Sequence, residues 1–136
     1  MSQPESRVLE TTTGAHTLEE IDAILGQAWA DHRHVPDAVR MQVGIATGEI
    51  GANIVEHAAQ GRAVWMRMEV RVSPHEVWVE FADAGIPATV DLASVELPDA
   101  MAERGRGLAL AQSALGKLSY HRTTVNHWTL ISKPFD

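Results

Sequence analysis

Three polar side chains stand four residues apart inside an apolar segment near the middle of the chain. They are Glu49, Asn53 and His57, in the stretch ATGEIGANIVEHA at residues 46–58. In a helix, residues four apart lie on the same face, one above another. A carboxylate can take a proton from an attacking hydroxyl, and an amide oxygen is a hard ligand suited to magnesium. The spacing therefore places a candidate base beside a candidate metal ligand.

These three residues, Glu49, Asn53 and His57, are called the polar file below. The polar file has two simpler interpretations. A solvated helix face would also carry polar residues at this spacing, and Glu49 and His57 on one face could share a metal ion. Against the first, the flanking residues are too apolar on both sides for an exposed helix. Against the second, the other six histidines offer no obvious matching pair apart from His32 and His34, which we expect in a loop. The file has to be judged together with the rest of the chain.

A second candidate group follows a predicted strand, in the stretch FADAGIPA at residues 81–88. Asp83 ends the strand, and Gly85 and Pro87 follow at intervals of two. A simple turn is one interpretation, because Asp and Gly favour turns for local reasons. In the functional interpretation, the carboxylate accepts a hydrogen bond from an amino group such as that of adenine, and Gly85 lets the backbone come close to a ligand.

A third stretch, ERGRGLALAQ at residues 103–112, places two glycines ahead of a predicted helix. Its candidate binding residues are Arg104, Gly105, Arg106, Gly107 and Leu108. Helix N-termini bind phosphate through free N–H groups and the helix dipole, and arginine adds charge of the right sign. A flexible helix start with two solvated arginines is an equal alternative. The stretch is neither a Walker loop nor a dinucleotide fingerprint, because the Lys-Ser/Thr pair and the βαβ unit are missing.

Hydrophobic periodicity predicts the elements that must position these stretches. We expect a strand at 7–13, helices at 16–32, 36–61 and 107–115, and two hairpins formed by 63–72 with 77–82 and by 117–122 with 127–132. Thr17 and Glu20 have the spacing of a capping box in the first helix. Helices that cover one face of a mostly antiparallel sheet make a two-layer α/β sandwich, so the predicted fold class is α+β.

Two features of these elements suggest functional constraint. Gly44, Gly48 and Gly51 each weaken the second helix by roughly 1 kcal/mol relative to Ala, so the close approach of another backbone or of a ligand should offset them. The connection over 83–106 shows no sustained period, and a connection longer than ~15 residues without regular structure is often a functional lid.

Composition is typical of one globular domain. The chain has 136 residues, of which 45% are hydrophobic and 21% charged, and no cysteine. We expect a mobile end at 1–7 and a single domain at 8–136, without disulfides or thiolate metal sites. The net charge of −7 argues against direct nucleic-acid binding. With neither a long apolar run nor a secretory signal in the sequence, we expect a cytoplasmic protein without a membrane segment.

Taken together, the three stretches resemble the ATP-binding sites of the GHKL (Bergerat-fold) superfamily, which includes the gyrase ATPase and sensor histidine kinases. Their order is E-x-x-x-N-x-x-x-H-A on a helix, D-x-G-x-P after a hairpin, and G-x-G-L-x-L opening a helix. Within the superfamily, the chain is most similar to the anti-sigma factor serine kinases, from about residue 8 to 133. The resemblance implies the GHKL-type sandwich with an ATP lid over 88–103.

The resemblance also implies roles for the residues of the first two stretches. Glu49 matches the proposed general base, and Asn53 matches the asparagine that holds the magnesium ion bridging the phosphates. His57 matches the family's histidine before alanine, whose role is the least defined. Asp83 matches the aspartate that recognises the adenine amino group, and Gly85 matches the glycine beside it.

The third stretch resembles the second glycine box, in which Gly105 and Gly107 approach the phosphates. Pro87 departs from the family pattern, because many members have a second glycine there. The expected lid also carries four acidic residues, Asp91, Glu96, Asp99 and Glu103. These departures bear on nucleotide affinity more than on fold.

As a function, the resemblance implies an ATP-dependent anti-sigma factor serine kinase with ATP and Mg²⁺ as cofactors. Such a protein phosphorylates a serine on an anti-sigma-factor antagonist of the STAS type, sequesters a sigma factor, and forms a homodimer through its N-terminal strand and first helix. The alternative is a non-catalytic nucleotide-binding regulatory module, and an intact Glu49 favours the kinase because a pure binder needs no base. An ATPase segment of a larger sensor kinase is a third interpretation, which we favour less.

Overall fold

The structure of the protein is a computed structural model, and it describes residues 6–88 and 103–136. Its elements in chain order are β1 (Ser6–Thr12), α1 (Thr17–Asp31), α2 (Asp37–Asn53), η1 (Ile54–Ala58), β2 (Trp65–Val72), β3 (Val77–Asp83), α3 (Glu103–Ala114), β4 (Lys117–Arg122) and β5 (Asn126–Ile131). The strands form one sheet in the order β1-β2-β3-β5-β4, in which every neighbouring pair is antiparallel. No helix in these two ranges is both long and apolar enough to cross a bilayer.

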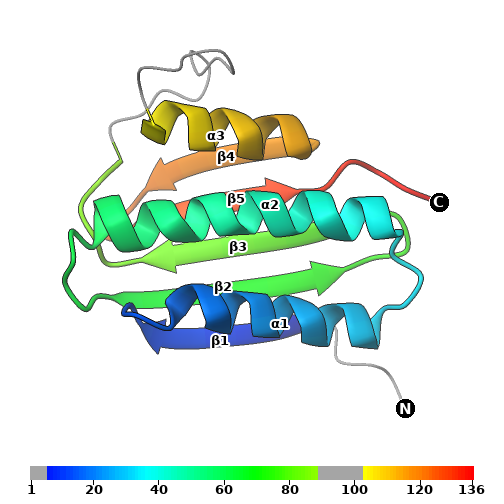
Figure 1. The fold of residues 1–136 in the computed structure, drawn as a ribbon, viewed down its shortest axis with the longest axis horizontal. Coiled ribbons are helices and arrows are strands. Elements are labelled where there is room, and N and C mark those ends of the chain that lie inside the picture. Colours follow the sequence, from blue (N-terminus) through cyan, green and yellow to red (C-terminus); the bar gives the residue numbers. More distant parts are fainter. Residues whose placement is uncertain (1–5, 89–102) are drawn as a thin grey trace.

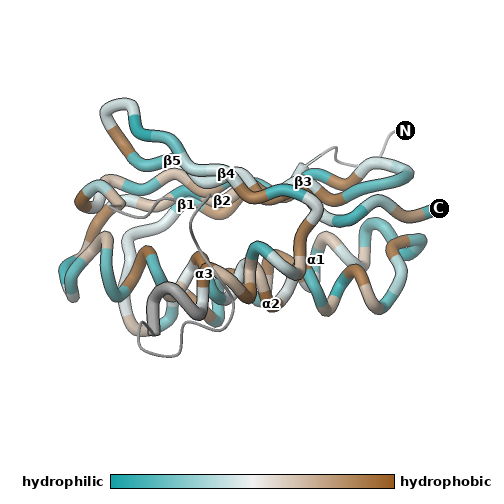
Figure 2. Tube along the Cα trace, turned by 90° about the horizontal axis from the view of Figure 1, so that it is seen from above, coloured by the Kyte–Doolittle hydropathy of each residue, from teal (hydrophilic) through white to brown (hydrophobic). Residues whose placement is uncertain are grey.

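The described α-helices all lie on one face of the sheet. α1 lies over β1 and β2, α2 over the middle of the sheet, and α3 beside β4 (Figure 1). Seen from above, helices and strands form two separate layers (Figure 2). The predicted α+β class and two-layer sandwich are therefore confirmed.

The core between the layers follows from the period of two in the strands. Met66, Met68 and Val70 of β2 are buried, whereas the residues that alternate with them are more exposed. From the helical layer, Val43 and Ile50 of α2 belong to the same buried cluster. A sheet that is covered by helices on one face only needs this alternation, because successive side chains of a strand point to opposite faces.

α2 is the central helix, in contact with α1 on one side and α3 on the other. The central position of α2 explains why the segment around the polar file is so apolar. The sheet and the neighbouring helices bury most of the surface of that segment. Ala46 and Ile50 are fully buried, and Gly51 lies against Ile21 of α1. The apolar flanks of the file are therefore packing surfaces.

The long helix expected from residue 36 to 61 ends in a different geometry. α2 stops at Asn53 and continues as a π-helical turn, η1, closed by a hydrogen bond of 2.8 Å from Ala59 N–H to Ile54 O. The chain then reverses through left-handed residues at Gln60 (φ 53°) and Gly61 (φ 76°). Gly61 thus terminates the helix as expected, because glycine adopts positive φ without strain.

Three expected boundaries differ from the structure. The capping box does not form, because Thr17 is itself the first helical residue and its Oγ1 accepts a hydrogen bond of 2.7 Å from Gly14 N–H. β1 begins at Ser6, one position before the expected start of that strand at residue 7, and Arg7 pairs with β2 and binds Asp31 through Nε–Oδ2 at 2.6 Å. α3 begins at Glu103, four positions before the expected residue 107.

The three glycines of α2 differ in their surroundings. A Cβ placed on Gly51 would lie 2.6 Å from Ile21 Cδ1 and 3.2 Å from Leu18 Cδ2, so α1 accounts for this glycine. A Cβ on Gly44 or Gly48 would meet no described neighbour within 4 Å. The close neighbours of Gly51 are therefore side chains of α1, where we expected another backbone or a ligand, and the described residues supply no close neighbour for Gly44 and Gly48.

Gly44→Ala should raise the free energy of unfolding by about 1 kcal/mol, because alanine favours the helix and restricts the unfolded chain. Gly51→Ala is the matched control, since its Cβ would press against Ile21 and should cancel most or all of that gain. Urea denaturation of both variants measures the difference. Equal gains at the two positions would contradict the close packing of α1 on Gly51.

Candidate functional site

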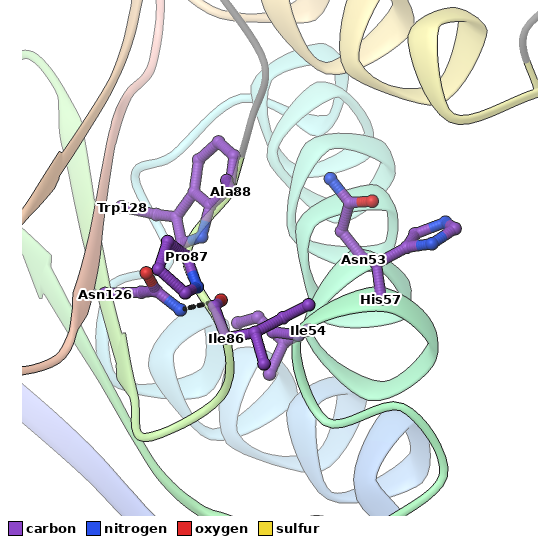
Figure 3. Close-up of a pocket in the computed structure, with 9 residues that line it drawn as sticks. Asn53, Ile54, His57, Ile86, Pro87, Ala88, Asn126 and Trp128 are labelled. Carbon is purple, nitrogen blue, oxygen red and sulfur yellow. Dashed lines mark hydrogen bonds between the residues drawn. The ribbon is translucent and has the colours of Figure 1, made fainter.

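A small pocket lies between the end of the central helix, the segment after β3, and β5. Its lining consists of Asn53, Ile54, His57, Ala58, Ile86, Pro87, Ala88, Asn126 and Trp128 (Figure 3). The volume of the cavity is about 20 Å³, room for about one water molecule, so the pocket in this conformation is too small for a nucleotide. Asn53, His57 and Pro87, all predicted from the sequence, therefore meet here.

Glu49 stands one turn before Asn53 and contacts α3. A Cβ placed on Gly107 would lie 3.0 Å from Glu49 Oε2, so the carboxylate rests against the first turns of that helix. Asn53 is buried, with 8% of its surface exposed, and borders the pocket. The polar file thus runs from the start of α3 at Glu49 to the pocket wall at Asn53 and His57.

The end of the helix is joined to the segment after β3 by a close backbone contact. Ala58 O, a helix-terminal carbonyl without a helical partner, accepts a hydrogen bond of 2.9 Å from Ile86 N–H. Gly85 is buried, and a Cβ there would lie 2.5 Å from both C and O of Ala58. The close approach of η1 therefore requires glycine at position 85. The contact of Gly85 with a ligand stays a prediction.

Asp83 is fully buried at the end of β3. Its Oδ1 accepts hydrogen bonds of 2.9 Å from Gly85 N–H and 2.9 Å from Asn126 Nδ2. Its Oδ2 is buried and has no hydrogen-bond partner. Burial raises the pKa of Asp83, opposed by the hydrogen bonds from Asn126 and Gly85 and by the charge of Arg122. An orphan acceptor of this kind fits an amino group of a ligand.

Asn126 is a site residue that the sequence reasoning missed. It is 1% exposed, lines the pocket, and donates through Nδ2 to Asp83 Oδ1 at 2.9 Å and to Ile86 O at 2.8 Å. Its Oδ1 accepts from Arg122 Nη1 at 3.0 Å and from the hydroxyl of Tyr120. In the sequence this asparagine lies in TTVN, which we interpret as a turn, and no local signal marks it as buried.

Two residues of β4 complete the polar network. Arg122 Nη1 donates to Gly85 O at 2.9 Å, and Tyr120 accepts a hydrogen bond of 2.9 Å from Ala88 N–H. The Tyr120 ring also lies 4.7 Å from that of Trp128, measured between centroids, in the pocket wall. β4 therefore holds both ends of the segment that forms the pocket rim.

The second glycine box lies inside α3 instead of ahead of it. Arg104, Gly105 and Arg106 belong to its first turns, and the structure describes only their backbone. Gly107 contacts Glu49, and Leu108 is 1% exposed and packs into the core. Most of the expected lid, residues 89–102, lies outside the described residues.

A magnesium ion at this site would rely on few protein ligands. Residues 6–88 and 103–136 contain no group of three His, Cys, Asp or Glu side chains arranged to hold a metal. Magnesium usually keeps several waters and binds phosphates with one or two protein oxygens. The amide oxygen of Asn53, at the wall of the pocket, fits that donor set.

The fold and the site define the class of the protein, an ATPase domain of the GHKL type. The family model described as "Histidine kinase-like ATPase domain" matches residues 15–133. Because that range covers most of the chain, the protein belongs to this family. Domains of this family bind ATP, usually with Mg²⁺.

A solved structure shows the same fold. It is the histidine kinase domain of the blue-light activated histidine kinase EL346 from Erythrobacter litoralis, with a TM-score of 0.53 and 21% identity. The match covers 81% of this chain and 59% of the other, so the chain spans less than two thirds of the length of that solved chain. No curated protein sequence matches the chain.

Asp83→Asn tests the electrostatic state of the buried carboxyl. Because the pKa of Asp83 is raised, the folded protein keeps this proton at higher pH than the unfolded chain. The contribution of Asp83 to stability therefore falls as pH rises from its unfolded pKa, about 3.9, through the raised folded pKa. The asparagine at this position in the variant carries no titrating carboxyl and does not lose stability in this way. The free energy of unfolding of the variant, relative to that of wild type, should therefore increase as the pH rises through this window.

Urea denaturation at a series of pH values measures this difference. Asp22→Asn, at an exposed position of α1, is the control and should show no such pH-dependent gain. A difference between Asp83→Asn and wild type that stays constant at every pH would contradict the effect of burial on Asp83.

Proposed function

We propose that this protein is an ATP-dependent anti-sigma factor serine kinase. The observation that supports it best is the contact of Glu49 with Gly107 at the start of α3, one helical turn from Asn53. A candidate base, a candidate magnesium ligand and the N-terminal turns of a helix thereby converge. Phosphoryl transfer depends on positioning and on the neutralisation of phosphate charge, which these groups can supply.

Recognition of adenine is supported by the buried carboxylate. Asp83 Oδ2 has no partner, and an unsatisfied buried acceptor destabilises the protein by about 1–3 kcal/mol. The exocyclic amine of adenine would donate to this oxygen and relieve that penalty. The surrounding wall of Ile54, Ile86 and Trp128 offers apolar surface for a purine ring.

The chemistry follows from the residue types. Glu49 would accept the proton of a serine hydroxyl while the hydroxyl oxygen bonds to the γ-phosphorus and the bond from that phosphorus to ADP breaks. Bound magnesium neutralises charge on the phosphates, and Asn53 would hold it through its amide oxygen. Backbone N–H groups in the first turns of α3 would face the phosphates.

The partners in this proposal come from the resemblance to anti-sigma factor kinases. They are a STAS-type antagonist that receives the phosphate and a sigma factor that the protein sequesters, in the cytoplasm. A net charge of −7 suits a basic, DNA-binding client. β1 is an edge strand, and its unpaired backbone groups could join a second copy in a homodimer.

A non-catalytic nucleotide-binding regulatory module is the second candidate. Its supporting observation is the small volume of the pocket, together with Pro87 at the position where the resemblance implies a glycine in many superfamily members. Such a module would use nucleotide to set its shape and would not need Glu49 as a base. Both candidates require nucleotide binding, and they differ in phosphate transfer alone.

Glu49→Gln separates binding from chemistry. Mg-ATP should stabilise wild type by about 4 kcal/mol at a thousandfold excess over Kd, because it binds only the native state. The variant should keep this stabilisation, since the amide has nearly the shape of the carboxylate, while serine phosphorylation should fall about 100-fold or more. Thermal unfolding and phosphate transfer to antagonist proteins captured from the native host measure the two effects.

Glu19→Gln, on the exposed side of α1, is the matched control and should change neither quantity. If Mg-ATP does not stabilise wild type, both candidate functions are excluded. If Glu49→Gln transfers phosphate as fast as wild type, Glu49 is not the general base. Binding by wild type without transfer to any captured antagonist would favour the regulatory module.

A further inference from the structure

Two histidines face each other across the last hairpin of the sheet. His121 of β4 is paired directly with His127 of β5 in the antiparallel register. Their rings are stacked, with centroids 4.6 Å apart and planes inclined by 7°. Side chains directly opposite in an antiparallel pair have Cβ atoms about 4.5–5.5 Å apart, so the register by itself brings the two imidazoles into contact.

The histidine pair lies on the face of the sheet opposite to the helices. Leu118 of β4 and Trp128 of β5 are buried on the helix-covered face. Because successive side chains of a strand point to opposite faces, His121 and His127 point away from the helical layer (Figure 2). His121 is exposed and His127 is half-buried, so an ion in solvent can reach both rings.

The residues beside the pair leave room for a cation. Arg122 follows His121 in the chain, but its guanidinium donates to Gly85 O and to Asn126 Oδ1 on the pocket side of the sheet. On β3, the residue directly opposite His127 is Ala82, whose short side chain leaves space beside the imidazole. The position therefore combines two imidazoles with open space, and the charge of Arg122 is used on the other face.

Thr123 supplies an oxygen to one of the two rings. Its Oγ1 lies 2.9 Å from His127 Nε2. In one tautomer of His127, Nε2–H donates to this hydroxyl and Nδ1 carries the free lone pair. Histidines that bind a metal commonly donate their other ring N–H to an oxygen, which fixes the tautomer and the orientation of the ring. Thr123 can therefore hold His127 in a tautomer that binds metal.

The stacked rings have to tilt before they can share one ion. Imidazole nitrogens bind Zn²⁺ at about 2.0–2.1 Å, so two of them on a tetrahedral ion lie about 3.3 Å apart, with the ion in the plane of each ring. Rotation about the bond to an imidazole ring has broad energy wells, and the exposed side chain of His121 is free to turn. Two imidazoles fill half of a tetrahedral shell, and water completes it.

We propose that His121 and His127 form a binding site for a divalent transition-metal ion such as Zn²⁺. Imidazole suits Zn²⁺, Ni²⁺ and Cu²⁺, whereas Mg²⁺ prefers oxygen ligands, so the site is distinct from the expected magnesium ligand Asn53. The ion bridges β4 and β5 on the outer face of the hairpin whose inner face carries Asn126 and Arg122. With two protein ligands, it is bound reversibly, unlike a structural zinc ion with four.

Isothermal titration calorimetry with ZnCl₂ on the metal-free full chain measures this site. Wild type should bind one Zn²⁺ per chain, and His121→Ala and His127→Ala should each weaken binding at least about 10-fold, because one of two protein ligands is lost. The double variant His32→Ala/His34→Ala is the matched control and should bind as wild type does. Its rings meet edge to face at 83° with centroids 6.1 Å apart, and His34 Nε2 already lies 3.0 Å from Ser73 O.

Thermal unfolding with and without ZnCl₂ gives a second readout. Because Zn²⁺ binds the native hairpin, it should raise the Tm of wild type and of the control and leave that of His121→Ala and His127→Ala unchanged. Each of these two variants tests the site by itself, so a folding defect in one, detected by far-UV circular dichroism, leaves the other to decide. Thr123→Val removes the hydroxyl and should weaken Zn²⁺ binding about 10-fold, and unchanged affinity would overturn the part assigned to Thr123.

The remaining outcomes decide the proposal separately from the proposed function, because none of them involves nucleotide. If wild type binds no Zn²⁺, or if either His121→Ala or His127→Ala binds it as tightly as wild type, the histidine pair is not the site. Loss of binding in the His32→Ala/His34→Ala control would place the ion elsewhere and would also overturn the proposal. Weakened binding in both single variants together with an unchanged control supports it.

Discussion

The site depends on one close backbone contact, that of Gly85 with Ala58, which is called the joint below. It brings the end of the central helix against the end of β3, with Ile86 N–H bonded to the carbonyl of Ala58 at 2.9 Å. A side chain on residue 85 would collide with the backbone of Ala58, at 2.5 Å. Without this joint, Asn53 on the helix and Asn126 at the sheet would not border one pocket.

A buried polar network surrounds that joint and is satisfied almost completely. Asn126 bonds at every position, and Tyr120 and Arg122 tie its amide to the rim of the pocket. A network of this kind is rigid, since a partner lost in a low-dielectric site leaves a costly unpaired group. The exception is Oδ2 of Asp83, and an unsatisfied group inside an otherwise satisfied network is typical of a functional site.

The sequence predicts the elements well where each depends on its own residues. The alternation of Met66, Met68 and Val70 predicts a strand with one buried face, and Gly61 predicts the end of the long helix. The sequence predicts an element's boundary less well where that boundary depends on contacts with other parts of the structure. Thr17 has the spacing of a cap but lies inside the helix, and nothing local distinguishes the π turn at Ile54–Ala58 from a regular helical end.

For the site, the sequence by itself determined that Glu49, Asn53 and His57 share one helical face, and that Asp83 ends a strand. These features depend on residues close together in the chain, where helix and strand periods fix direction. Only the tertiary structure decided that Asn126 bonds to Asp83, 43 residues away, and that Glu49 lies against Gly107. Such contacts depend on the register of distant strands and on how helices pack over them, and neither is written in any local pattern of residues.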